Sequence, residues 1–209
     1  MKISYAVTVC NELVEIQRLL DLLLKQKRLQ DEIVVLVDNP CGEDDEMIST
    51  LYQYESHNHD HMTVWRSEFA GHFANWKNKL TGYCTGDYIF QIDADEIPSE
   101  VLIDNLPQIL EENDIDVIMV PRINTVEGLT EAHVAKWHWQ VNEHGWVNWP
   151  DYQWRIYRRD ESITWKNPVH EVLTGYTTIT QLPAVADLSL VHAKTIDRQE
   201  RQNEFYERL

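Results

Sequence analysis

The sequence has little positive charge and no long apolar run. It contains 18 Lys and Arg against 35 Asp and Glu, which gives a net charge of −17 over 209 residues. Such a chain repels phosphate backbones and anionic lipid, so nucleic acid and membrane surfaces are poor partners for it. No apolar stretch approaches the roughly 20 residues that cross a membrane as a helix. The first residues lead directly into a strand-like segment, so no signal peptide is expected.

Cysteine and glycine are also scarce. Cys10, Cys41 and Cys84 are scattered and form no CxxC pair, which predicts reduced thiols and a cytoplasmic location. No glycine lies in the segment after the first apolar run, residues 9–12. A nucleotidyltransferase would need a glycine-rich, basic loop there, and a dinucleotide-binding fingerprint is absent as well.

The spacing of apolar residues alternates between strand-like and helix-like patterns. Strands are expected at residues 3–9, 33–37, 62–65, 88–92 and 116–121, and helices at 11–26, 43–54, 73–84 and 99–111. Ser99 is the expected N-cap of the last of these helices. This alternation predicts an α/β fold with a mostly parallel, Rossmann-like sheet flanked by helices. Ligands of such sheets bind beyond the carboxyl ends of the strands.

The second part of the chain differs in composition and in the spacing of its apolar residues. Six of the eight tryptophans lie between residues 137 and 165, where helical patterning fades. We expect one domain over residues 1–209, made of an α/β half (1–121), a Trp-rich antiparallel or irregular half (122–196) and a polar C-terminal helix (197–209). That helix has no stop signal, which suggests a longer, multidomain protein.

Two carboxylates, Asp93 and Asp95, follow the expected fourth strand directly. Like charges this close need a cation or hydrogen bonds to compensate them. Mg²⁺ and Mn²⁺ prefer oxygen ligands, often one or two carboxylates together with substrate phosphates. The pattern is therefore that of a metal site, or of a solvated strand end followed by a helix cap. A haloacid-dehalogenase-type phosphatase is disfavoured, because its DxD follows the first strand of the fold.

Several segments resemble one enzyme family. Residues 73–80 (FANWKNKL) and 85–96 (TGDYIFQIDADE) resemble the core of family 2 glycosyltransferases of the GT-A fold. Residues 8–12 and 37–38 are similar to the first and second strand ends of that family. Residues 149–158 (WPDYQWRIYR) and 168–171 (PVHE) resemble elements of lipopolysaccharide-core glucosyltransferases. The chain is also similar to the N-terminal part of a chlorella-virus glycosyltransferase of capsid glycosylation, which would place it in the host cytoplasm.

The resemblance implies a UDP-sugar donor, such as UDP-glucose or UDP-rhamnose, and a Mn²⁺ or Mg²⁺ cofactor. In this family Asp38 would accept from the uracil N3–H, and Val9 and Glu12 would line the base pocket. Asp93 would touch the ribose or a metal-bound water, while Asp95 would bind the metal directly. The donor phosphates would be bound by Lys77 and Arg155. Lys77 departs from the family, which more often has Arg there and so gains a bidentate fork.

An inverting transferase needs a base that takes the proton of the acceptor hydroxyl. Asp151 and Glu171 are the two candidates, and Asp151 is preferred from its place in the resemblance. The family often adds a late histidine to the metal or phosphate site. His192 is preferred for this role because it ends an apolar run, and His170 is second.

Three further features leave alternatives open. Trp137, Trp139, Trp146 and Trp149 can line a glycan acceptor site, since sugar faces pack on aromatic rings, or they can fill a core. The histidines of residues 57–61 alternate as in a metal site but lie between elements, so a solvated loop is expected there. A carbohydrate-binding module without catalysis is the non-enzymatic alternative, which would not need aspartates on successive strand ends.

Overall fold

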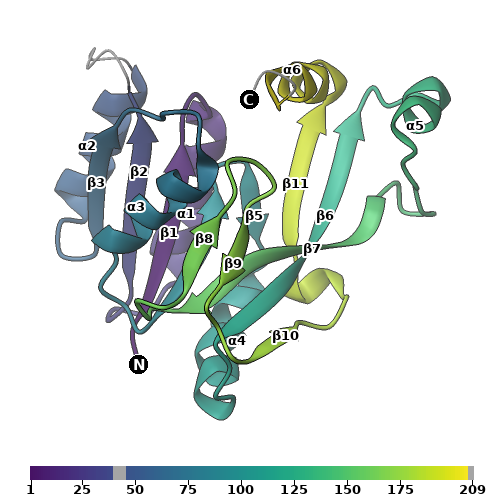
Figure 1. Ribbon diagram of the computed structural model, residues 1–209. Coiled ribbons are helices and arrows are strands. Elements are labelled where there is room, and N and C mark those ends of the chain that lie inside the picture. Colours follow the sequence, from purple (N-terminus) through teal and green to yellow (C-terminus); the bar gives the residue numbers. More distant parts are fainter. Residues whose placement is uncertain (40–45, 207–209) are drawn as a thin grey trace.

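The computed structural model describes residues 1–39 and 46–206 (Figure 1). The first part of the chain forms β1 (Ile3–Val9), α1 (Leu13–Gln26), β2 (Glu32–Asp38), α2 (Glu46–His57), β3 (Met62–Ser67), α3 (Phe73–Tyr83), β4 (Tyr88–Asp93), β5 (Glu96–Pro98) and α4 (Glu100–Glu112). The second part forms β6 (Val117–Glu127), α5 (Glu131–Trp137), β7 (Val147–Arg158), β8 (Thr164–Lys166), β9 (Val172–Thr174), β10 (Ile179–Gln181), the 3₁₀ turn η1 (Ala186–Leu188), β11 (Leu190–Thr195) and α6 (Ile196–Tyr206).

One large mixed sheet runs through both parts in the order β3-β2-β1-β4-β7-β6-β11-β5, and β10 pairs with β6. The strands β3, β2, β1 and β4 are parallel to one another. The strand β7 enters antiparallel between β4 and β6, and β11 runs parallel to β6. The carboxyl ends of β1, β2, β3, β6 and β11 therefore face the same side, upward in Figure 1. The strands β8 and β9 form a separate hairpin sheet over α3.

Each face of the parallel strands packs against a different core. Side chains such as Val35 pack with α1, α2 and α4 on one face, whereas Val34 and Leu36 pack with α3 and the β8–β9 sheet on the other. Alternate residues of a strand point to opposite faces, so a run of apolar residues fills both cores. Gly86 marks a tight point at the start of β4, since a Cβ there would lie 2.6 Å from the backbone nitrogen of Ser4.

The predicted alternation of strands and helices is confirmed, as is the mostly parallel sheet flanked by helices. The hydroxyl of Ser99 accepts a hydrogen bond from the Leu102 nitrogen, as expected of an N-cap. The short helix α5 was not predicted, nor was the three-residue strand β5 between β4 and α4. The neighbour of β5 in the sheet is β11, nearly 100 residues later in the chain, so only a distant pairing defines it.

Some predictions fall at the edges of what the structure describes. The expected beginning of the second helix (residues 43–45) and Cys41 lie outside the described residues, as do the last three residues of the C-terminal helix. Cys10 and Cys84 are free thiols. The segment with alternating histidines covers the end of α2 and the turn before β3, with His57 and His59 exposed. Among the described helices, none combines the length and apolar character that a membrane crossing requires.

The second half extends the first sheet and also carries an arm. The strands β6 and β7 are long, and near Asp151 their register shifts as β7 bends away from the sheet (Figure 1). We call residues 128–149 the arm; it includes α5 and four tryptophans. Two aromatic pairs organise it, Trp137 with Trp139 and Trp146 with Trp149. Trp165, by contrast, is buried in the core under α3.

Candidate active site

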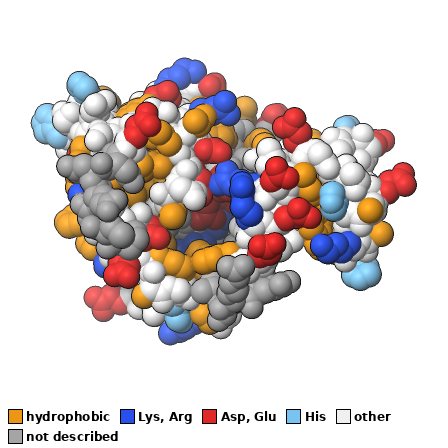
Figure 2. Space-filling view, turned by 90° about the horizontal axis from the view of Figure 1, so that it is seen from above, with side chains coloured by type: hydrophobic (Ala, Val, Ile, Leu, Met, Phe, Trp, Pro, Cys, Tyr) orange, Lys and Arg blue, Asp and Glu red, His pale blue; other side chains and the backbone are white. Residues whose placement is uncertain are grey.

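Polar side chains gather where the carboxyl ends of the strands meet. Figure 2 looks down on this end of the sheet and shows acidic and basic side chains close together near its centre. Asp38 ends β2, Asp93 ends β4, and Asp95 lies in the turn between β4 and β5. Since adjacent parallel strands end at the same edge, chain segments far apart in sequence meet here.

Asp93 is tied down by three neighbours. Its Oδ1 accepts hydrogen bonds from Thr8 on β1 (3.0 Å) and from Gln91 (3.1 Å), and its Oδ2 pairs with Arg155 of β7 at 2.7 Å. Burial alone would raise the pKa of Asp93, but the charges of Arg155 and Lys77 outweigh it and hold this pKa far below its usual range. Asp93 is therefore a fixed anion at the centre of the site.

Glu96 lies buried at the bottom of the site. Its carboxylate accepts from Arg155 at 2.6 and 2.9 Å and from Arg122 at 2.8 Å, and its side chain is fully buried. Arg155 is itself 3% exposed and holds both Glu96 and Asp93. A buried carboxylate needs such pairing, because an isolated ion is costly to desolvate. The geometry favours a positioning role for Arg155; its predicted contact with donor phosphates stays a prediction.

Asp95 lies beside His192 of β11, with 3.1 Å between Oδ2 and Nε2. Burial raises the pKa of Asp95, but the hydrogen bond and charge of His192 bring it down to about 2. Burial lowers the pKa of His192, although the hydrogen bond and charge of Asp95 act in the opposite direction. Its Nδ1 lies 2.8 Å from the Asn124 Oδ1 and its Nε2 faces Asp95, so a metal beside Asp95 would take the place of the Nε2 proton. Metal-ligating histidines are oriented in this way, by a hydrogen bond from the other ring nitrogen.

These residues fit a divalent metal with open coordination positions. A carboxylate and an imidazole are two protein ligands, and Mg²⁺ or Mn²⁺ commonly takes its remaining ligands from water and substrate phosphates. Within residues 1–39 and 46–206, no group of three or more His, Cys, Asp or Glu is arranged to hold a metal. A metal held by Asp95 and His192 would therefore need water and donor oxygens to complete its coordination.

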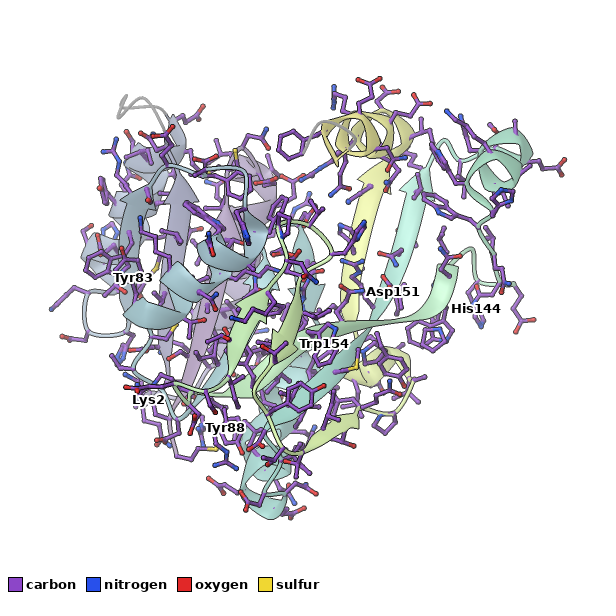
Figure 3. All side chains as sticks on the ribbon, viewed as in Figure 1. Lys2, Tyr83, Tyr88, His144, Asp151 and Trp154 are labelled. Carbon is purple, nitrogen blue, oxygen red and sulfur yellow. The ribbon has the colours of Figure 1, made fainter. Side chains whose placement is uncertain are left out.

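Asp151 is joined to the same group of residues. Its Oδ2 accepts from Arg122 at 2.7 and 2.9 Å and from Asn124 at 2.8 Å, and its Oδ1 accepts from Gln153 at 2.7 Å. Burial raises its pKa, but Arg122 and these hydrogen bonds leave the pKa lowered overall. Figure 3 shows Asp151 where β7 bends from the sheet toward the arm. Through Asn124 and His192, it is connected to Asp95.

Glu171, the second candidate base, is held by Lys77 at 2.5 Å. Lys77 is 4% exposed and lies 4.6 Å from the centre of the Trp165 ring. The side chain of Glu171 is 16% exposed, against 27% for Asp151. His170, the second choice for the metal, is exposed in the turn between β8 and β9. Of the two predicted histidines, His192 is the one within hydrogen-bond distance of Asp95.

The predicted base pocket lies at the ends of β1 and β2. Asp38 Oδ1 accepts from the Phe69 backbone nitrogen at 2.9 Å, and Val9 is buried beside it on β1. Glu12 accepts from the backbone nitrogens of Cys10 (2.9 Å) and Asn11 (3.0 Å), which shapes the loop before α1. Burial, with the charge of Asp38, raises the pKa of the Cys10 thiol to about 11, so Cys10 stays protonated.

Comparison with known proteins decides the family. The sequence model of Glycosyl transferase family 2 matches residues 4–181. The chain belongs to this family. It therefore carries a glycosyltransferase domain. No curated protein sequence matches the chain.

Solved structures agree with the GT-A fold of a family 2 glycosyltransferase. The structure of S. aureus TarS is 17% identical with a TM-score of 0.63, covering 92% of this chain and 37% of that one. Its residues 1–349 in complex with UDP-GlcNAc give 18% identity and a TM-score of 0.62, covering 93% of this chain and 59% of that one. The glycosyltransferase domain described here spans less than two thirds of these chains.

Three contributors to the site had no role in the sequence analysis. Glu96 belongs to the quoted family motif, but its burial depends on β5, which the pattern did not predict. Arg122 lies in β6, beyond the apolar run that marked that strand, so nothing local distinguished it. Arg198 in the first turn of α6 pairs with Asp95 at 3.2 Å, and the polar pattern of that helix gave no sign of it.

Proposed function

We propose that this domain transfers a hexose or deoxyhexose from a UDP-sugar to a glycan hydroxyl, with Mn²⁺ or Mg²⁺ bound and with inversion. UDP-glucose and UDP-rhamnose are the donors proposed from the resemblance. One observation carries the proposal: Asp38, Asp93 and the Asp95–His192 pair converge at one edge of the sheet. The existence of TarS structures with UDP and with UDP-GlcNAc supports a uridine donor.

The donor-side roles follow the chemistry of each side chain. Asp38 accepts from the uracil N3–H, and Val9 and Glu12 line the pocket around the base. Asp93, fixed by Arg155 and Thr8, accepts from a ribose hydroxyl. Asp95 and His192 hold the metal, which offsets charge on the departing diphosphate. An acidic protein needs such compensation to bind an anionic donor.

The acceptor-side role belongs to Asp151. Its carboxylate takes the proton of the acceptor hydroxyl as the new glycosidic bond forms and UDP leaves. Asp151 is favoured over Glu171 because its side chain is the more exposed, and because Asn124 and His192 connect it to the metal site. In the ion pair with Arg122 it is a weak base, so the incoming hydroxyl must share or replace that contact.

The arm supplies a surface for the acceptor glycan. A pocket of about 600 Å³ is lined by Asn142, Glu143, His144, Trp146, Trp149 and Ala184 to Ala186. The two indole rings are 4.8 Å apart and 65° inclined, and Figure 3 shows the labelled His144 at the outer end of this region. Aromatic faces beside amide and carboxylate groups suit a pyranose, which has both apolar and hydroxyl surfaces.

A donor panel tests the proposal. UDP-, GDP- and dTDP-sugars, including UDP-glucose, UDP-rhamnose and UDP-GlcNAc, are scored for Mn²⁺-dependent hydrolysis and for a rise in melting temperature. A response confined to UDP-sugars and lost with chelator supports it. If no UDP-sugar gives a response, the main claim is wrong. Calorimetry with UDP alone separates the enzyme from a carbohydrate-binding module, which would not bind UDP.

The proposal includes the setting of the domain. From the resemblance to a chlorella-virus enzyme, we propose one domain of a longer viral polypeptide that acts in the host cytoplasm. Free thiols at Cys10 and Cys84 support a reducing compartment.

A further inference from the structure

The first turn of α6 brings a positive charge onto the candidate metal site. The helix α6 begins at Ile196, directly after β11 ends at Thr195, so no loop separates it from the strand that carries His192. Arg198 therefore lies above the site, with its side chain 25% exposed. Its NH2 is 3.2 Å from Asp95 Oδ2, the same oxygen that faces His192.

Arg198 also contacts the beginning of α1. Its NH2 donates to Glu12 Oε1 at 3.1 Å and its NH1 donates to Glu15 Oε1 at 2.9 Å. One guanidinium thus pairs with three carboxylates from two separate parts of the chain. Lys194 is the next cation near Asp95, and burial lowers its pKa. Negative charge is in excess here, so a second cation would be attracted to the site.

A metal on Asp95 would compete with Arg198 for the same carboxylate. Mg²⁺ binds carboxylate oxygens at about 2.0–2.1 Å and keeps a full octahedral shell. A guanidinium 3.2 Å from the same oxygen would intrude into that shell and repel the ion. Binding of a metal would therefore weaken the contact between Arg198 and Asp95. Glu12 and Glu15 still hold the guanidinium nearby, on the side of α1 that faces the predicted base pocket.

We propose that Arg198 is a donor-binding residue that neutralises Asp95 in the empty site and moves to the donor diphosphate when metal and donor bind. This inference rests on the proposed function. The guanidinium fork matches phosphate oxygens in a bidentate manner, which the ammonium of Lys77 does not. A diphosphate brings negative charge back to the place where the metal has displaced Arg198.

Calorimetry on three variants tests this role. Arg198→Ala removes the guanidinium, Arg198→Lys keeps the charge without the fork, and Arg201→Ala is the matched control, one turn further along α6 and exposed. In Mn²⁺, we expect Arg198→Ala to bind UDP about 10- to 100-fold more weakly than the unmodified protein, because charge-assisted hydrogen bonds are lost. The UDP affinity of Arg198→Lys should lie between those of Arg198→Ala and the unmodified protein. Arg201→Ala should bind UDP as tightly as the unmodified protein.

Titration with Mn²⁺ alone should show the opposite change, a higher affinity of Arg198→Ala for the metal. Without nucleotide, Arg198→Ala should bind Mn²⁺ about two- to fivefold more tightly, because the competing surface cation is gone. Circular dichroism confirms that each variant is folded. If Arg198→Ala binds UDP as tightly as Arg201→Ala, the inference is wrong while the proposed function stands. If the unmodified protein itself fails to bind UDP in Mn²⁺, the proposed function fails and this inference with it.

Discussion

The four parallel strands and the strands that follow them hold together by different means. In β1 to β4 and their helices, apolar side chains fill both faces, and an ion pair such as that between Lys2 and Glu32 is partly exposed. Where β5, β6, β7 and β11 meet, charged groups occupy the interior: Glu96 and Arg155 are buried, and Arg122 joins them to Asp151. The first region is a packed scaffold, and the second carries the charged side chains of the candidate site.

This difference has an energetic meaning. Apolar packing stabilises in proportion to buried area and tolerates small changes, whereas a buried ion network is stable only while every partner is present. Within the described residues, no buried side-chain nitrogen or oxygen lacks a hydrogen-bond partner, so the network is complete. Substitutions in the two regions should therefore fail in different ways.

Arg155→Ala should give the largest effect. It leaves Glu96 and Asp93 without their main counter-charge, and breaking a buried ion pair by removing one partner costs about 3–5 kcal/mol. Transfer should be lost together with stability. Urea unfolding and a transfer assay on the same preparation measure both quantities, and a stable but inactive Arg155→Ala would contradict this.

Leu20→Ala is the matching change in the parallel region. Leu20 of α1 is fully buried and touches no charged group of the site. A cavity of this kind costs about 2–5 kcal/mol. At a temperature where the variant is folded, its turnover per folded molecule should equal that of the unmodified protein. Lost turnover in folded Leu20→Ala would show that the scaffold and the site are not separable.

Asp151→Asn should lower turnover about 10²- to 10⁴-fold, because the base is lost while the side chain keeps its shape. UDP affinity in Mn²⁺ should change little, since Asp151 lies on the acceptor side. Rate measurements with saturating donor, paired with calorimetry, check this prediction. Glu171→Gln is the comparison variant; if it loses more turnover than Asp151→Asn, then Glu171 is the base.

Trp149→Ala tests the arm and should act on the acceptor alone. Removing one aromatic wall of the pocket should raise the KM for the acceptor glycan about 5- to 30-fold, which corresponds to about 1–2 kcal/mol. Turnover at saturating acceptor and UDP affinity should be unchanged. Trp65→Ala, an exposed tryptophan on β3, is the control and should leave all three values unchanged. If both variants had the same acceptor KM, the arm would not be part of the acceptor site.

Glu32→Gln should give the smallest effect, at the margin of the parallel region. Burial raises the pKa of Glu32, but hydrogen bonds from Lys2, Ser4 and Thr85 bring it down to about 2. A carboxylate with a lowered folded-state pKa stabilises above its unfolded pKa, and this stability is lost as pH falls toward 2. Between pH 4.5 and 2, the variant should lose less stability than the unmodified protein, by about 1 kcal/mol. Parallel acid melts of both proteins measure this.

The sequence predicted the parallel region well because its signals are local. Alternation along β2 and helical spacing along α1 are properties of single segments, and Ser99 as an N-cap needs only the residues that follow it. The site could be predicted only in part. Asp38, Asp93 and Asp95 were found by their place at strand ends, where a family resemblance added roles to a general rule of α/β sheets.

The site contacts that were not predicted from the sequence depend on pairing between distant segments of the chain. Glu96 is buried because β5 meets β11, and Arg122 matters because β7 turns antiparallel between β4 and β6. Arg198 reaches Asp95 only after the last strand is in place. No local pattern in a single sequence encodes a partner about 100 residues away, so these contacts needed the three-dimensional structure.

The position of β11 has a consequence for how the molecule is made. During synthesis β5 and β6 leave the ribosome long before β11, the strand that joins them. Until residue 192 has emerged, Asp95 has no imidazole beside it, and one side of β6 is an open edge. Domains fold from the N-terminus as they are synthesised, and contacts of large sequence separation form late. The pair of Asp95 and His192 can therefore form only after β11 has been synthesised.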